Sequence, residues 1–246
     1  MNITFDENIR LDRSKWLSML GVSEEHLAKA ETDEKMGAAL KRLQKQMGEA
    51  EQKLIETARP AFAYSALDRD ALDVRGESLA KHLEGCDRIV ISAATLGHGV
   101  DELISETQST KIALSVVIDC GASLLAVVAA DIAMERIRED LSECKAQTAG
   151  SDIGAADAEP LFMTERFSPG YGDSPLEMQE QLLELLDAER QLGITLSKGY
   201  MMSPSKSITG IMGLADHPVT GRMATCDECV LRGKCRLLKE GKRCYD

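Results

Sequence analysis

One stretch of the chain, residues 166–173, places a cation, a phenol and two glycines within eight positions. Arg166 presents a planar fork of N–H donors that suits a carboxylate. Gly170 and Gly172 allow the main chain to approach a ligand closely. Tyr171 adds an aromatic face and a hydroxyl, which suit a cationic or adenine-bearing ligand. The stretch therefore predicts either a small-molecule site or an ordinary loop that caps the next helix.

A second group of chemically capable residues is a set of four cysteines within the last 21 positions. These are Cys226, Cys229, Cys235 and Cys244. A Cys-x2-Cys pair followed by two further thiolates is a ligand pattern for structural zinc or for an iron–sulfur cluster. The pattern predicts a metal-binding tail over residues 222–246, with zinc, an iron–sulfur cluster and no metal all left open. The other cysteines, expected to be small core residues, are Cys86, Cys120 and Cys144.

The composition and charge of the 246 residues limit the function classes. The chain is 43% hydrophobic and 28% charged, which is typical of a soluble globular protein. The last 25 residues carry seven basic and four acidic residues, whereas the other 221 carry 22 basic and 37 acidic residues. An acidic body argues against binding to nucleic acid. Because the N-terminus has no secretory pattern and no uninterrupted apolar run reaches about 18 residues, we expect a cytoplasmic protein that does not bind membranes.

Apolar periodicity and turn residues predict helices mixed with short strands at irregular intervals, which is typical of an α+β fold. The expected helices cover residues 14–20, a stretch from 23, 34–58, 78–83, 100–106, 111–141 and 175–191. The expected strands cover residues 3–5, 61–67, 88–94, 161–167, 194–196, 200–203 and 207–214. The helix over 111–141 is expected to bend near Gly121. Asp119 and Asp131 lie about 120° apart on it, so they are not predicted to form a paired-carboxylate site.

The order of several motifs resembles one known family. The run RFSPGYGD is followed by PLEMQEQLLELLDAERQLGITL and then by SKGYMMSPSKSITGIMGL. This series resembles the activation domain of vitamin B12-dependent methionine synthase, and IVISAATLG with the helix around residues 119–131 resembles its short, free-standing members. The resemblance covers about residues 75–215. It implies helices around a small, mostly antiparallel curved sheet, with an activation-like domain over 1–221 and the tail over 222–246.

The resemblance also implies a function and a set of site residues. Members of the family bind S-adenosylmethionine beside a corrinoid and support reductive methylation of cob(II)alamin. The cobalamin would be supplied by a partner methionine synthase chain, because this sequence has no D-x-H-x-x-G signature, and a donor protein could supply the electron. Arg166 would hold the methionine carboxylate. The further ligand contacts implied are Pro169, Gly170, Tyr171, Ser205 and Ser207, with no catalytic acid or base.

Two departures from the family pattern favour an alternative. His217-Pro218 is not followed by the tyrosine that large members have, and Val127 stands where related short proteins often have Glu. The alternative is an iron–sulfur or zinc-containing redox or adaptor protein that kept the fold but not S-adenosylmethionine binding.

Overall fold

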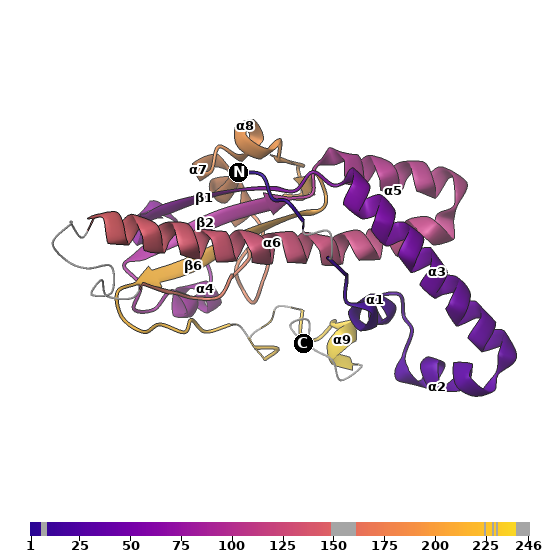
Figure 1. Cartoon of the computed structure of the whole chain (residues 1–246). Coiled ribbons are helices and arrows are strands. Elements are labelled where there is room, and N and C mark those ends of the chain that lie inside the picture. The colour runs from indigo at the N-terminus through magenta and orange to yellow at the C-terminus, as the bar shows by residue number, and fades with distance from the viewer. Residues whose placement is uncertain (6–8, 149–160, 224, 228, 230, 240–246) are drawn as a thin grey trace.

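A computed structural model of the chain describes residues 1–5, 9–148, 161–223, 225–227, 229 and 231–239. Its main sheet has four antiparallel strands in the order β1-β2-β6-β3 (Figure 1). These strands are β1 (Ala61–Asp68), β2 (Arg88–Thr95), β6 (Ser207–Ala215) and β3 (Phe162–Met163). A second pair, β4 (Thr195–Leu196) and β5 (Met202–Ser203), is also antiparallel. The expected α+β class is confirmed.

The helices account for most of the regular structure. They are α1 (Arg13–Met19), α2 (Glu24–Thr32), α3 (Glu34–Thr57), α4 (Glu77–His82), α5 (His98–Thr110), α6 (Ile112–Thr148), α7 (Met178–Leu185), α8 (Ala188–Leu192) and α9 (Arg236–Lys239), with a 3-10 turn over Arg69–Ala71. Asp12, Ser23 and Asp33 accept hydrogen bonds from main-chain N–H groups in the first turns of α1, α2 and α3. These capping contacts explain why the first three helices begin there.

The two faces of the main sheet are covered by different helices. On one face, Val90 and Met212 pack with α3, α5 and α6 in one apolar cluster. On the other face, Ile89 and Ile211 pack with α4, α7 and α8 in a second cluster. Because side chains alternate along a strand, the even-numbered residues of β6 face α6 and the odd-numbered ones face α7. Figure 1 shows α6 lying along the sheet as a single long rod.

The long helix α6 is unbroken from Ile112 to Thr148, beyond the expected end at residue 141. Gly121 serves a close contact rather than the expected bend. A Cβ at residue 121 would stand 2.3 Å from Trp16 Cζ2, and the buried Trp16 indole N–H donates to the Val117 carbonyl at 3.0 Å.

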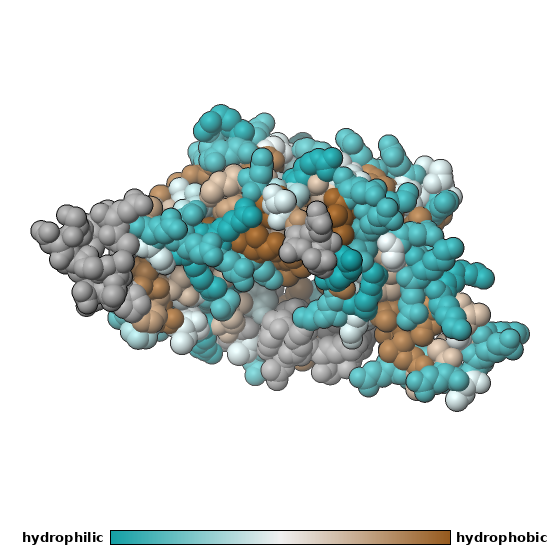
Figure 2. All heavy atoms as spheres, in the orientation of Figure 1, coloured by the Kyte–Doolittle hydropathy of each residue, from teal (hydrophilic) through white to brown (hydrophobic). Residues whose placement is uncertain are grey.

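Helix α6 has an unusually apolar composition, interrupted by Asp119 and Asp131. Residues Ile112–Cys144 are long and apolar enough to cross a membrane by length and composition alone. Half of the most apolar window is buried inside the protein, and the core helix of a soluble protein passes the same test. Figure 2 shows hydrophobic residues over the middle of α6 and hydrophilic residues toward its C-terminal end. Packing against the sheet accounts for the buried half of this window.

Three local expectations were wrong. The single helix expected over 175–191 divides at Asp187, which has a positive φ of 47° and separates the buried Leu186 and Ala188. An Asp tolerates this left-handed conformation better than most residues. The strand expected over 161–167 is reduced to β3 and one bridge between Phe167 and Ile211. Cys86 is buried as expected, but Cys144 is exposed.

Candidate functional site

The side chain of Arg166 lies on the α6 face of the sheet. Its stem crosses Gly210, where a Cβ would stand only 2.5 Å from Arg166 Cγ. Its guanidinium Nη1 donates to Asp131 Oδ1 on α6 at 3.2 Å. Only 17% of the Arg166 side chain is exposed, whereas 60% of the Asp131 side chain is exposed. The site thus presents a cation and an anion side by side at the junction of helix and sheet.

A second ion pair joins the same helix to the start of the same strand. Lys206, which directly precedes β6, donates from Nζ to Asp119 Oδ1 at 2.8 Å and to Ser123 Oγ at 3.0 Å. Only 11% of the Lys206 side chain is exposed, against 52% for Asp119. The lysine charge is therefore largely removed from solvent and is compensated by the carboxylate beside it.

We call the line of residues between these ion pairs the α6–β6 seam. It comprises Asp119, Ser123, Val127 and Asp131 on α6, Lys206, Ile208 and Gly210 on the strand side, and Arg166. Four-residue steps keep neighbouring side chains on a similar side of a helix, and two-residue steps keep strand residues on one face. Val127 is 43% exposed and Ile208 is half-buried, so the middle of the seam is apolar and its two ends are charged.

The two predicted serines fix the main chain on either side of Lys206. Ser205 donates to Asp101 of α5 from both its main-chain N–H (2.7 Å) and its hydroxyl (2.5 Å). The buried Ser207 hydroxyl donates to the Pro204 carbonyl at 2.8 Å and lies 2.8 Å from Thr95 Oγ1. Both serines therefore position the residue between them, which sequence reasoning did not single out.

The predicted loop residues are arranged around a turn. Pro169 is buried, and Gly170 has a φ of +85° and donates its N–H to the Ser174 carbonyl at 3.0 Å. Asp173 accepts from the N–H groups of Glu77 (2.8 Å) and Ser78 (2.9 Å) at the start of α4. These hydrogen bonds lower the pKa of the Asp173 carboxyl, and the bond from Ser78 has the largest effect. The loop therefore does cap a helix, although α4 precedes it in the chain.

The structure places Tyr171 away from the guanidinium of Arg166. The Tyr171 ring meets Phe167 edge-on with centroids 5.6 Å apart, within the cluster on the α7 face. Arg166 contacts α6 on the opposite face. The structure thus groups Arg166 with Asp131 rather than with Tyr171.

Sequence reasoning missed Asp131 as a partner of Arg166. The 120° between Asp119 and Asp131 argued only against a direct carboxylate pair. It did not consider that each carboxylate could meet its own cation at the edge of the helix. The signal that could have found them is the four-residue column 119, 123, 127 and 131, which is polar except at Val127.

The cysteine tail is described only in part. Among the described residues, no three His, Cys, Asp or Glu side chains gather in a way that could hold a metal ion. Cys226, Cys229 and Cys235 are free and half-buried, and Cys244 lies outside the described residues. The Leu238 N–H does donate to Cys235 Sγ at 3.5 Å.

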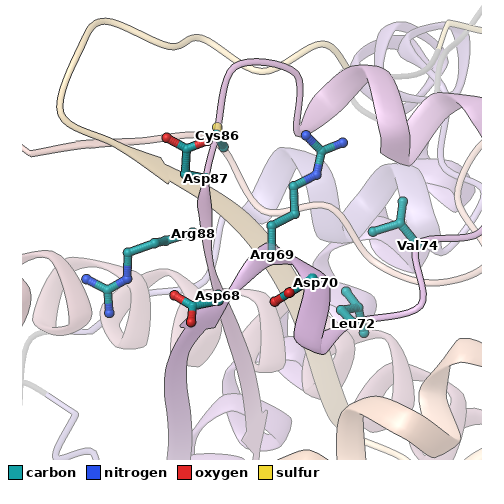
Figure 3. Close-up of a pocket in the computed structure, with 8 residues that line it drawn as sticks. All are labelled: Asp68, Arg69, Asp70, Leu72, Val74, Cys86, Asp87 and Arg88. Carbon is teal, nitrogen blue, oxygen red and sulfur yellow. The ribbon is translucent and has the colours of Figure 1, made fainter.

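A separate pocket of about 570 Å³ lies at the far end of β1 and β2. Figure 3 shows acidic and basic side chains mixed around it. Its lining residues are Asp68, Arg69, Asp70, Leu72, Val74, Cys86, Asp87 and Arg88. Burial raises the pKa of the Cys86 thiol, so this sulfur is held in its unreactive protonated form. Arg166 is not among the lining residues, and the pocket is distinct from the seam.

An antiparallel sheet covered on one face by one long helix, with a guanidinium beside a carboxylate at their junction, defines an α+β protein. A family described as the activation domain of vitamin B12-dependent methionine synthase matches residues 77–220. The match covers more than half of the chain, so the protein belongs to this family, as the resemblance predicted.

A solved structure has the same fold. It is the crystal structure of the MetH reactivation domain bound to AdoHcy (S-adenosylhomocysteine), with a TM-score of 0.57 and 18% sequence identity. The alignment covers 94% of this chain and 82% of that one. The comparison with curated proteins gave no match.

Proposed function

We propose that this protein binds S-adenosylmethionine at the α6–β6 seam and supports reactivation of a cobalamin carried by a partner methionine synthase. The observation that carries the proposal is the Arg166–Asp131 pair at 3.2 Å. An amino-acid head group bears one carboxylate and one ammonium, and the pair offers one complementary charge for each. Membership of the family and a fold shared with a domain bound to AdoHcy support the same ligand class.

The residues present fit the amino-acid end of the ligand. Arg166 would bind the carboxylate, and a bidentate contact would hold it in one orientation. Asp131, one turn of α6 beyond Val127, would accept from the ammonium, so the missing Glu at position 127 does not remove the acidic contact. Because Gly210 has no side chain, the Arg166 stem lies flat on the strand and its guanidinium is positioned before the ligand arrives.

The chemistry then depends on orientation. S-adenosylmethionine supplies an electrophilic methyl group on its sulfonium, and the acceptor belongs to the partner chain. This protein needs only to hold the methyl donor at a defined place and angle, since a fixed geometry removes much of the entropic cost of reaction. In the described part of the seam, the carboxylates and cations are paired with each other. This arrangement suits a role in holding the ligand rather than in transferring protons.

The proposal is tested by calorimetric titration of AdoHcy into wild type, Arg166→Ala and Arg138→Ala. Arg138 is the matched control, because it is an arginine of α6 that pairs with a carboxylate, Glu165, at 3.6 Å but lies outside the seam. We expect Arg166→Ala to weaken binding about thirtyfold or more and Arg138→Ala to bind as wild type does. Decarboxylated S-adenosylmethionine lacks the carboxylate, so its binding should be insensitive to Arg166→Ala. Equal affinities in all three proteins would contradict the proposal.

A second proposal concerns the tail: we infer that its four cysteines bind zinc or an iron–sulfur cluster. The Cys-x2-Cys spacing and the N–H bond to Cys235 Sγ favour it, since main-chain N–H donors commonly surround metal-bound thiolates. Metal analysis and a visible spectrum of anaerobically purified protein separate the outcomes. A broad band that bleaches on reduction indicates a cluster, and a colourless protein with stoichiometric zinc indicates a structural site. Cys229→Ser should lose the metal and Cys86→Ser should keep it; wild type without metal would contradict this proposal.

The redox or adaptor alternative predicts metal in the tail and no affinity for AdoHcy. The two experiments together therefore distinguish it from the reactivation role.

A further inference from the structure

We propose that Asp119, held by Lys206, binds the ribose hydroxyls of the nucleoside half of the ligand. The inference rests on the proposed function, because it assigns the second end of the same seam. Its basis is the Lys206–Asp119–Ser123 cluster, a paired charge that neither the family match nor the fold comparison assigns.

The cluster lies along the same line as the amino-acid end. Residues 206 and 210 are four strand positions apart, or about 13 Å at about 3.3 Å per residue. Asp119 and Asp131 are twelve helix positions apart, or about 18 Å at 1.5 Å per residue. Both Lys206 and Gly210 face α6, so the two charged ends lie on one side of the sheet. A ligand with an amino-acid head at Arg166 therefore has its other half directed either along this seam or away from it.

The middle of the seam favours the first direction. Val127 is 43% exposed, and Ile208 is half-buried beside the cluster of α6. An apolar stretch between two polar ends matches a molecule in which a thioether or sulfonium linker joins an amino acid to a nucleoside.

The chemistry of the cluster suits a diol. Half of the Asp119 side chain reaches solvent, and a carboxylate can accept from two hydroxyl groups at once. Acidic side chains bind ribose hydroxyls in dinucleotide sites for the same reason. Lys206 is 11% exposed and donates to both Asp119 and Ser123, so it fixes the carboxylate rather than meeting the ligand itself. Asp119 is therefore the binding residue and Lys206 a positioning residue.

The test compares two ligands and two ends of the seam. AdoHcy carries both halves, whereas adenosine carries only the nucleoside. Asp119→Asn should weaken both ligands about tenfold, because a hydrogen bond to a charged group is lost. Arg166→Ala should weaken AdoHcy alone. Asp140→Asn is the matched control. Asp140 is a carboxylate on α6 beyond Asp131 and outside the seam, so this variant should bind both ligands as wild type does.

The outcomes separate this inference from the proposed function. If Asp119→Asn binds AdoHcy like wild type while Arg166→Ala does not, the nucleoside lies elsewhere and the inference is wrong, although the proposed function stands. If wild type does not bind AdoHcy, both are overturned. Lys206→Met should reproduce part of the Asp119→Asn defect, and Lys206→Arg should restore affinity. Thermal unfolding of each variant identifies any loss that comes from misfolding.

Discussion

The two faces of the main sheet differ in how they use polar groups. On the α6 face, two cations meet two partly exposed carboxylates at the edge of the helix. On the α7 face, polar groups are buried and bonded within the protein, as with Thr209 Oγ1 and Gln179 Oε1 at 2.7 Å. The cations of these pairs are largely buried, so each needs its carboxylate, and the buried groups of the α7 face likewise must be satisfied for the fold to hold. The comparison shows that both faces carry the core, but that carboxylates stay partly exposed at the edge of the α6 face, whereas polar groups of the α7 face such as Thr209 are used inside the protein.

The largest effect that would sharpen this comparison is expected on the α7 face. Phe167 is fully buried and contacts the rings of His82 and Tyr171. Phe167→Ala should lower the free energy of unfolding by about 3–5 kcal/mol, because it leaves a cavity. Denaturant titration measures the loss, and Phe167→Leu should recover part of it. The folded fraction should keep its affinity for AdoHcy; a loss of affinity in excess of unfolding would break the division between the faces.

A matched pair of glycines in β6 tests both faces with the same chemical change. In Gly210→Ala the new Cβ would stand 2.5 Å from Arg166 Cγ, and in Gly213→Ala it would stand 2.4 Å from Cys86 Sγ. Each should cost about 1–3 kcal/mol of stability through overpacking. Only Gly210→Ala should also weaken AdoHcy, by about tenfold, because only it displaces the guanidinium. Equal affinity in the two variants would show that the position of the Arg166 stem is unimportant.

The smallest expected effect is a pH dependence of the unfolding free energy, through a histidine on the α7 face. The buried His82 ring lies with Nε2 2.9 Å from the Glu165 carbonyl and Nδ1 3.3 Å from the Arg222 carbonyl. Burial lowers the pKa of His82 below 6.5, and the bonds to Glu165 and Arg222 oppose that shift only in part. The unfolded chain therefore binds the proton more readily, so stability should fall as pH decreases from 6.5 toward the lower folded pKa.

Comparison with His82→Gln isolates this contribution from other titrating groups. The variant should lack the part of the slope that wild type shows in that window, measured as unfolding free energy at several pH values. Identical slopes in wild type and His82→Gln would contradict the prediction.

Much of the fold followed from local signals in the sequence. The expected helix starts near residues 14, 23 and 34 and the apolar run of β2 are patterns that short-range physics decides. The division of the helix at Asp187 did not follow, because tertiary packing of Leu186 and Ala188 sets it. The site was predicted as a loop around Arg166, but its partners are distant in sequence. Asp131 and Lys206 become partners of the site only when α6 lies along β6, and no local pattern encodes that placement.

The contact between Trp16 and Gly121 has a consequence for where this domain begins. The family match starts at residue 77, but the Trp16 indole of α1 packs on Gly121 of α6 and donates a hydrogen bond to the Val117 carbonyl. A fragment restricted to the matched region would lack Trp16, and apolar side chains of α6 that it covers would become exposed to water. Helices α1 and α3 therefore belong to the same hydrophobic core as α6. A domain boundary placed at the start of the family match would divide that core.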